Sequence, residues 1–161
     1  MKGIKRTTRR RRREGKTDYG ARIKFLKSKK PRVVVRKTNR YIIGQIVVSE
    51  ISQDNVVASV NSKELLDKGW PKNLKGSLKS LPACYLAGFL LGKKSGEFKE
   101  GILDLGLQRN IKKSRLYSFL KGLVDSGFNI NHIKEILPEE EDLNKNEKLS
   151  GLINKLKGGM K

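Results

Sequence analysis

The sequence predicts an α/β fold in which helices pack on one mixed β-sheet. Three segments with a strand pattern follow one another within residues 32–60, and two helical patterns then lie on either side of a fourth, shorter apolar segment. This order of three strands, a helix, a strand and a helix indicates a mixed sheet covered by helices. At 161 residues, the chain has the length of one domain with extensions.

The first two strands are predicted to form a basic hairpin. Two β-branched runs, Arg32–Lys37 and Tyr41–Val48, are separated by three polar residues that include an asparagine, which favours an antiparallel hairpin. Successive strand residues face opposite sides. Two valines of the first strand can therefore be buried while the guanidinium groups of Arg32 and Arg36 project from the other face.

Residues 1–16 have the composition of a basic arm. Arg9–Arg13 is an uninterrupted arginine run, and past Met1 the segment has one aliphatic side chain. Such a segment cannot form a packed core, so we expect it to stay disordered until it binds a partner. A membrane-surface anchor or a mitochondrial presequence is an alternative, although the arm has no amphipathic apolar stripe.

A helix is predicted after the arm, with Thr17 as its N-cap. Tyr19, Ile23 and Leu26 share one helical face, and we expect this stripe to dock on the rest of the protein. Pro31 ends the helix and leads into the first strand. The outward face is then expected to carry basic side chains, namely Arg22, Lys24 and Lys27.

Further along the chain, local signals predict a third strand, a short helix and a loop. Val56–Val60 is expected to form a meander with the hairpin. Asn61 and Glu64 have the spacing of a capping box, which predicts a short helix over residues 62–68. The following stretch, residues 72–80, contains three lysines, a glycine and two serines and is predicted to be a loop.

Two helices are predicted around the fourth strand. Pro82 suits the first turn of a helix whose alanines and leucines recur at helical spacing as far as Leu91. The short apolar run Ile102–Leu107 is predicted to be a buried strand. Ser114 is the expected cap of the next helix, which ends at Gly127.

The C-terminal extension changes character after Pro138. An acidic run over residues 139–142 is expected to be solvated or to face a basic neighbouring protein. Apolar residues at helical spacing over residues 149–156 predict a short helix that needs docking to persist. The chain is thus expected to divide into a basic arm (1–16), one α/β domain (17–137) and a partly helical extension (138–161).

The charge of the chain indicates a polyanionic partner. The formal net charge is +21, and residues 1–40 hold eighteen Lys or Arg against two acidic residues. Like charges at this density repel one another unless a partner neutralises them. No apolar run has membrane-spanning length and no secretory signal is recognisable, so we expect a cytosolic protein that does not bind membranes.

Side chains that support catalysis are scattered through the sequence. Asp104 lies in the fourth strand, but no two carboxylates have a spacing that brings them together, so a metal-dependent nuclease is only a remote alternative. Cys84 is expected to be a buried apolar side chain and His132 a structural or surface residue. Trp70 is either a packing residue or a platform for base stacking. We expect no enzyme activity, metal site, cofactor or small-molecule substrate.

Short blocks of sequence, spread over roughly residues 9–140, form a pattern that is specific when the blocks are taken together in their order along the chain. They are Arg11–Tyr19, Leu26–Arg40, Ile42–Ile46, Ser62–Leu65, Gly69–Trp70, Pro82–Lys94, Ile102–Gly106, Ser114–Arg115, Leu120–Gly122 and Glu135–Pro138. Together these blocks resemble the archaeal form of ribosomal large-subunit protein eighteen, whose eukaryotic counterpart is large-subunit protein five. Lys113 departs from the pattern, because the family usually has glycine there.

The resemblance implies a structural constituent of the large ribosomal subunit in the cytoplasm. It implies binding to 5S rRNA and to the large (23S-type) rRNA in the central protuberance, beside neighbouring large-subunit proteins. It also implies the topology of the ribonuclease-H-like motif without its catalytic residues. The alternative that charge alone allows is a general double-stranded RNA- or DNA-binding protein.

In the family, the arm, the first helix and the first hairpin contact RNA. By resemblance this role carries over to Arg9, Arg10, Arg11, Arg12, Arg13, Lys16, Arg22, Arg32, Arg36, Lys37, Thr38, Asn39 and Arg40. We add further candidate RNA-binding residues within or near the basic region, together with the tryptophan: Tyr19, Lys24, Lys27, Lys29, Lys30 and Trp70.

Overall fold

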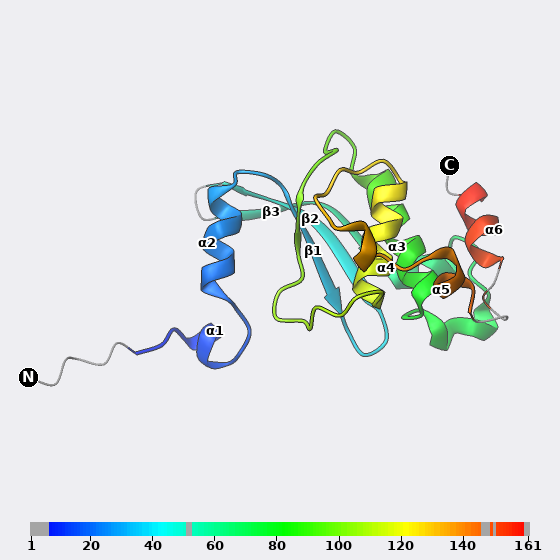
Figure 1. Ribbon diagram of the computed structural model, residues 1–161, viewed down its shortest axis with the longest axis horizontal. Coiled ribbons are helices and arrows are strands. Elements are labelled where there is room, and N and C mark those ends of the chain that lie inside the picture. The colour runs from blue at the N-terminus through cyan, green and yellow to red at the C-terminus, as the bar shows by residue number, and fades with distance from the viewer. Residues whose placement is uncertain (1–6, 51–52, 146–148, 150, 160–161) are drawn as a thin grey trace, which may run out of the picture.

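A computed structural model describes residues 7–50, 53–145, 149 and 151–159 (Figure 1). It confirms the predicted α/β fold with a four-stranded mixed sheet in the order β3-β2-β1-β4. Helices α3 and α4 pack on one face of the sheet, and the two N-terminal helices stand at the other side of the molecule (Figure 1). No helix in the described ranges is both long enough and apolar enough to cross a membrane.

The predicted hairpin is confirmed. Strands β1 (Arg32–Lys37) and β2 (Ile42–Glu50) pair antiparallel, with Lys37 opposite Ile42 at the turn. The turn is closed by Thr38, whose backbone N–H and hydroxyl both lie 2.9 Å from the carbonyl oxygen of Tyr41. The valine side of β1 faces the core as expected, because Val33 and Val35 are fully buried.

The two edge strands, β3 and β4, have lengths that differ from the predicted ones. Strand β3 (Gln53–Asn61) begins earlier than Val56 and pairs antiparallel with β2 across a bulge. Strand β4 (Ile102–Asp104) pairs parallel with β1 and stops well before the predicted Leu107. It stops because the Asp104 carboxylate accepts a hydrogen bond from the N–H of Gly106, whose φ of 60° turns the chain out of the sheet.

The two main helices follow the sequence signals. Helix α3 (Leu81–Lys94) has Pro82 in its first turn, and the side chain of Ser80 caps it through the N–H of Ala83. Helix α4 (Arg115–Asp125) begins after Ser114 and ends before Gly127, as predicted. Almost all of α3 between residues 82 and 92 is buried, because the sheet and α4 cover one side and the C-terminal segment covers another.

Two glycines let α3 and α4 approach closely. A Cβ atom at Gly88 of α3 would collide with the carbonyl oxygen of Phe119, and one at Gly122 of α4 would collide with that of Tyr85. Both obstacles are backbone atoms, which cannot rotate away. The helix pair is therefore fixed at backbone contact.

Replacing Gly122 by alanine is expected to lower the free energy of unfolding by roughly 2–3 kcal/mol, because the helices must separate. Urea unfolding measured by circular dichroism checks this value. The control is Gly158→Ala, where an added Cβ meets no atom within 4 Å. Equal effects of the two substitutions would contradict the close-contact explanation.

A second apolar cluster lies on the far side of α3. It holds Trp70, which is 1% exposed, with residues from the short 3-10 helices η1 (Ser62–Leu66) and η2 (Lys72–Ser77) nearby. The predicted capping box of Asn61 and Glu64 is confirmed at the start of η1, although the helix is of the 3-10 type. The stretch predicted to be a loop contains η2 and is therefore more ordered than expected.

The C-terminal segment holds η3 (Lys134–Ile136), α5 (Glu140–Asn144) and α6 (Leu152–Gly159). Ile136 of η3 packs on the cluster between the sheet and the two main helices, whereas α5 and α6 dock on this second cluster. Ile153 and Leu156 of α6 are buried against α3, which confirms the predicted amphipathic docking. Helix α6 starts at Leu152 and not at Leu149, which is buried just before the helix begins.

The N-terminal helix does not dock as predicted. In α2 (Tyr19–Lys27), Ile23 and Leu26 are 53% and 37% exposed, whereas Arg22 is half-buried on the side facing the sheet. The N-cap is Asp18 and not Thr17, because its carboxylate accepts hydrogen bonds from two backbone N–H groups of the first turn. Before it, residues 7–16 of the arm form one helical turn, α1 (Arg10–Arg13), where the sequence predicted no structure, and residues 1–6 of the arm lie outside the described residues.

Cys84 of α3 is buried, as expected. Burial raises the pKa of its thiol from 9.0 to about 12, although nearby cations such as Arg115 and Lys37 oppose the rise. The folded protein keeps the thiol neutral while the unfolded chain ionises it above pH 9. The stabilising contribution of this group is thus complete below pH 9 and is lost as the pH rises toward 12.

We expect the free energy of unfolding to fall by up to about 2 kcal/mol more between pH 8 and 10.5 in the natural chain than in Cys84→Ala. Urea unfolding of both proteins at a series of pH values measures this difference in free energy of unfolding. Groups other than Cys84 titrate in both proteins, so their contributions cancel in the difference. Parallel pH curves would show that the thiol is not held neutral by the fold.

Candidate nucleic-acid interface

The sheet face opposite α3 and α4 borders a polar groove. The groove has a volume of about 650 Å³, and α2 and the end of the arm form one wall while the sheet forms the floor. Arg11 and Lys16 of the arm line it together with Arg36 of β1. The structure thus brings the end of the arm, the first helix and the two strands of the hairpin to one surface.

A chain of ion pairs runs along the floor of this groove. Asp104 of β4 accepts from Arg32 at 3.3 Å and from Arg36 at 3.0 Å. Asp54 at the start of β3 accepts from Arg32 at 2.9 Å and from Arg22 of α2 at 3.0 Å. Five charged side chains from four elements are therefore linked, and the Arg22–Asp54 pair ties α2 to the sheet.

Asp54 is held in its ionised form. Burial alone would raise the pKa of this carboxyl group, but the hydrogen bond from Ser49 and the pairing with Arg32 and Arg22 outweigh burial and lower the pKa below 3.8. The link between α2 and the sheet is accordingly present above pH 3.8 and is lost in stronger acid. At neutral pH the Arg22–Asp54 ion pair therefore links α2 to the sheet.

The ion-pair chain changes the role of one predicted RNA-binding residue. Arg32 is 5% exposed and its guanidinium group is occupied by Asp54 and Asp104. The sequence analysis placed this group on an open face, which is wrong because long-range acidic partners cover it. Arg32 supports its neighbours, whereas the Arg36 side chain is 40% exposed and can reach a ligand.

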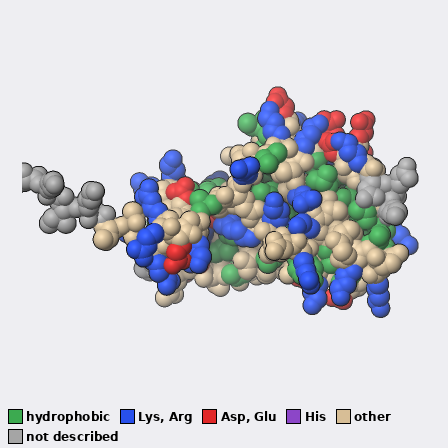
Figure 2. All heavy atoms as spheres, turned by 90° about the horizontal axis from the view of Figure 1, so that it is seen from below, with side chains coloured by type: hydrophobic (Ala, Val, Ile, Leu, Met, Phe, Trp, Pro, Cys, Tyr) green, Lys and Arg blue, Asp and Glu red, His purple; other side chains and the backbone are tan. Residues whose placement is uncertain are grey.

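The exposed cations gather around the N-terminal elements. Figure 2 shows many Lys and Arg side chains around α1 and α2, at the left of the molecule, and others spread over the rest of this face. Tyr19 at the start of α2 lies under Arg9, with 4.8 Å between the guanidinium carbon and the ring centre. Apart from Arg22, the other predicted basic residues of the arm and of α2 and its C-terminal end are exposed, namely Arg10–Arg13, Lys16, Lys24, Lys27, Lys29 and Lys30.

The hairpin turn forms a second exposed group. Lys37, Thr38, Asn39 and Arg40 are all exposed, and the turn lies at the end of β1 away from the α2–β1 connection (Figure 1). Lys79 donates a hydrogen bond to the carbonyl oxygen of Asn39 at 2.6 Å and so supports the turn. The sequence analysis did not include Lys79, because its closeness to the hairpin arises only in the folded protein.

Trp70 does not lie in this interface. Its ring is 1% exposed, and its indole N–H donates to the carbonyl oxygen of Leu74 at 3.2 Å. A base cannot stack on a ring that is covered on both faces, so the packing interpretation of Trp70 is correct and its assignment as an RNA-binding residue is wrong.

Asp104, the carboxylate considered for a nuclease, is bound by two arginines and by the N–H of Gly106. Its oxygens are therefore taken up by structural contacts. Within the described ranges, no three His, Cys, Asp or Glu side chains converge in a way that would hold a metal ion. The described part of the site presents exposed cations around a polar groove.

Comparison with known proteins gives consistent matches. The family model described as ribosomal large subunit proteins 60S L5 and 50S L18 matches residues 5–99. The chain is 49% identical to large ribosomal subunit protein uL18 of Korarchaeum cryptofilum, over 91% of this chain and 74% of that protein. It is 44% identical to uL18 of Methanothrix thermoacetophila (81% and 76% covered) and 46% identical to uL18 of Methanospirillum hungatei (82% and 74% covered).

Proposed function

Because the chain belongs to the family of large-subunit ribosomal proteins that includes 60S L5 and 50S L18, we propose that it binds 5S rRNA and helps attach it to the large rRNA. Membership of this family makes the protein a structural constituent of the cytoplasmic ribosome and not an enzyme. Ribosomal RNA and ribosomal proteins are accordingly its partners. The identity of the RNA as 5S rRNA, and the bridging role in the central protuberance, are the proposed steps.

The observation that carries the proposal is the shared groove of the arm, α2 and the hairpin. Exposed arginines and lysines line or border it, and the ion pairs among Arg22, Asp54 and Arg32 connect the α2 wall to the sheet floor. Phosphate contacts of this kind position an RNA without reading its sequence, and counterion release drives binding. A cationic groove bounded by three different elements suits a folded RNA of defined shape better than an arbitrary duplex.

In this proposal the three parts of the chain have different roles. Residues 1–16 neutralise phosphates, residues 17–137 form the domain that orients the RNA, and residues 138–161 extend that domain. Exposed polar groups at the hairpin turn, above all Asn39, are placed to contact base edges, because amides can donate and accept hydrogen bonds at the same time. Arg40 beside it contacts a phosphate.

The test is equilibrium binding of the full-length protein to the 5S rRNA of its own species, against a tRNA or a scrambled duplex of similar length, across a salt series. The proposal predicts that the 5S complex persists at salt concentrations that dissociate the competitor. Equal affinities that fall together with salt would contradict it and would support a general double-stranded RNA- or DNA-binding protein.

Arg40→Ala is expected to weaken 5S binding and to reduce the slope of log K against log salt by roughly one unit, because one phosphate contact is lost. The matched control is Lys68→Ala, an exposed cation outside the groove and the hairpin. The same salt series measures both variants. An unchanged slope for Arg40→Ala would remove this residue from the interface.

A further inference from the structure

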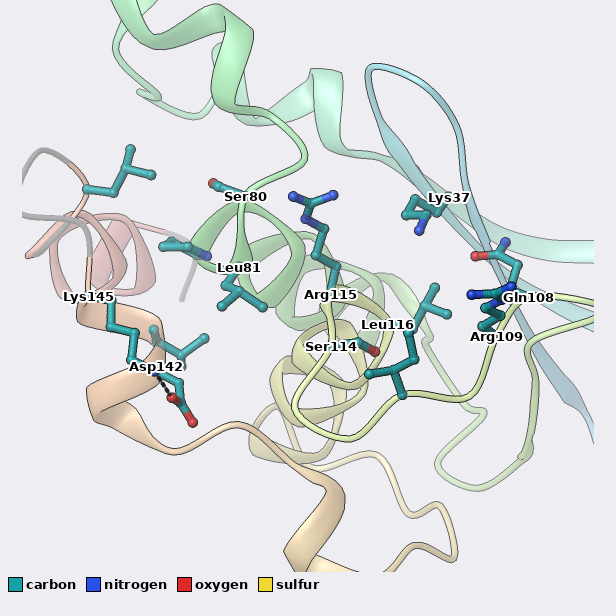
Figure 3. Close-up of a pocket in the computed structure, with 14 residues that line it drawn as sticks. Lys37, Ser80, Leu81, Gln108, Arg109, Ser114, Arg115, Leu116, Asp142 and Lys145 are labelled. Carbon is teal, nitrogen blue, oxygen red and sulfur yellow. Dashed lines mark hydrogen bonds and ion pairs between the residues drawn. The ribbon is translucent and has the colours of Figure 1, made fainter.

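A second cavity opens beside the hairpin, at the N-terminus of α4. It has a volume of about 690 Å³, which lies within the range of small-ligand sites. Figure 3 shows Lys37 and Arg109 on one side, Ser80 and Leu81 across from them, and Arg115 rising between the two sides. None of the cavity residues except Lys37 was included among the candidate RNA-binding residues.

The rim of the cavity is cationic. Lys37, Arg109 and Arg115 are exposed there, and none of the three forms an ion pair with any described residue. The acidic residue of the lining, Asp142, is already paired with Lys145 at 2.6 Å and with Lys113 at 3.4 Å. Three positive charges therefore remain for an anionic group at the rim.

The interior combines apolar walls with two unsatisfied polar atoms. Leu81, Ile111 and Leu116 contribute the apolar walls. The side-chain oxygens of Gln108 and Ser114 are buried and have no hydrogen-bond partner in the described part of the chain. Ser114 occupies the N-cap position of α4 but makes no side-chain cap. A buried polar atom without a partner costs free energy, and a ligand that supplies the partner recovers it.

These features match an unstacked nucleotide. A nucleotide has a phosphate for the cationic rim, a flat base for the apolar walls, and ring or amino N–H groups that can donate to the oxygen of Gln108. A bound peptide without acidic side chains would satisfy the apolar walls but would leave the three cations unpaired. We propose that the cavity accepts one nucleotide extruded from rRNA, with its base inside and its phosphate at the rim.

The position of the cavity supports this assignment. Lys37 belongs both to the hairpin and to the cavity rim, and Gln108 lines both this cavity and the groove. The cavity is therefore continuous with the proposed RNA surface, and the inference rests on the proposed function for the source of the nucleotide. It adds a second kind of contact, because a base in a pocket is recognised by shape and hydrogen bonds and not by charge alone.

The experiment is an NMR titration of the full-length protein with the four nucleoside 5′-monophosphates, each compared with ribose 5-phosphate and inorganic phosphate. We expect saturable shifts of the Gln108 side-chain amide and of the Ile111 and Leu116 methyl groups. At least one nucleotide should bind about tenfold more tightly than ribose 5-phosphate, the gain from one hydrogen bond and the buried base.

Variants distinguish the part of the site that binds the base from the part that binds the phosphate. Gln108→Leu should abolish most of the advantage of the nucleotide over ribose 5-phosphate, whereas Arg115→Ala should weaken both. Lys112→Ala, an exposed neighbour outside the cavity lining, should leave both affinities unchanged. Resonances of residues remote from the cavity report whether each variant remains folded.

Two results would overturn the inference. One is the absence of saturable cavity shifts up to about 10 mM nucleotide, a range that detects even weak sites. The other is equal binding of nucleotides, ribose 5-phosphate and inorganic phosphate, which would indicate an anion site with no pocket for a base. Binding to 5S rRNA is measured on the same protein. Preferential 5S binding without nucleotide binding would refute the proposed nucleotide site and leave the proposed 5S rRNA binding standing.

Discussion

Replacing the five residues Arg9–Arg13 by alanine is expected to flatten the salt dependence of 5S rRNA binding by up to about 4–5 units of slope, at about 0.9 per phosphate. All five side chains are exposed, and the ion pair between Arg10 and Glu14 is long, at 3.7 Å. These guanidinium groups are therefore available to displace counterions. Affinity should fall most at low salt, and a plot of log K against log salt measures the effect.

The control for this variant removes the same charge elsewhere. Five exposed lysines outside both the groove and the cavity are replaced by alanine: Lys63, Lys68, Lys93, Lys99 and Lys155. If their loss flattens the slope as much as loss of the arginines, the arm acts only through the net charge of the protein. A much smaller change supports direct phosphate contacts by the arm.

Asp104→Ala is expected to lower the free energy of unfolding by about 2–3 kcal/mol, because it removes one of the two carboxylates that pair with the buried Arg32, while Asp54 at 2.9 Å remains. Asp104 is 6% exposed and Arg32 is 5% exposed, so water cannot replace the lost carboxylate. The Nε atom of Arg32 already lacks a hydrogen-bond partner in the described part of the chain. Urea unfolding of the variant measures the loss.

Two comparisons refine this result. Glu97→Ala removes an exposed carboxylate with no ion pair among the described residues and should change stability by less than about 0.5 kcal/mol. Asp104→Asn keeps a hydrogen-bond acceptor for the N–H of Gly106 but removes the charge. Its loss of stability should lie between those of Asp104→Ala and Glu97→Ala. A loss below about 1 kcal/mol for Asp104→Ala would show that the ion-pair chain is not structurally important.

Local sequence patterns were sufficient for the elements whose signals lie within a few residues of one another. The hairpin followed from two β-branched runs around a short polar turn, and α3 from Pro82 and the repeat of apolar residues. The capping box of Asn61 and Glu64 was likewise found in place. In each case the residues that define the element also make its contacts.

The arrangement of the site required contacts between distant parts of the chain. Arg32 and Asp104 are 72 residues apart in sequence, and Arg22 and Asp54 are 32 apart. No local pattern reports such pairs, so the burial of Arg32 and the orientation of α2 were not predicted. The exposure of Ile23 has the same cause. The Arg22–Asp54 ion pair turns the side of α2 that carries Arg22 toward the sheet, and the side that carries Ile23 is left exposed.

Lys113 shows how a departure from a family pattern is accommodated. Its φ of 54° lies in the left-handed region, which is consistent with the glycine that the family usually has at this position. The ammonium group pairs with Glu139 at 2.5 Å and with Asp142 at 3.4 Å. These contacts tie the turn before α4 to the acidic run, which is therefore partly paired within the chain and not only solvated.

Co-precipitation of 5S rRNA with the large rRNA tests whether this protein joins the two RNAs. Labelled 5S rRNA is mixed with immobilised large-subunit rRNA in the presence or absence of the purified full-length protein, at a salt concentration that dissociates tRNA. We expect that 5S rRNA is retained only when the protein is present, and that the Arg9–Arg13 alanine variant retains much less. Equal retention of 5S rRNA with and without the protein would contradict the claim.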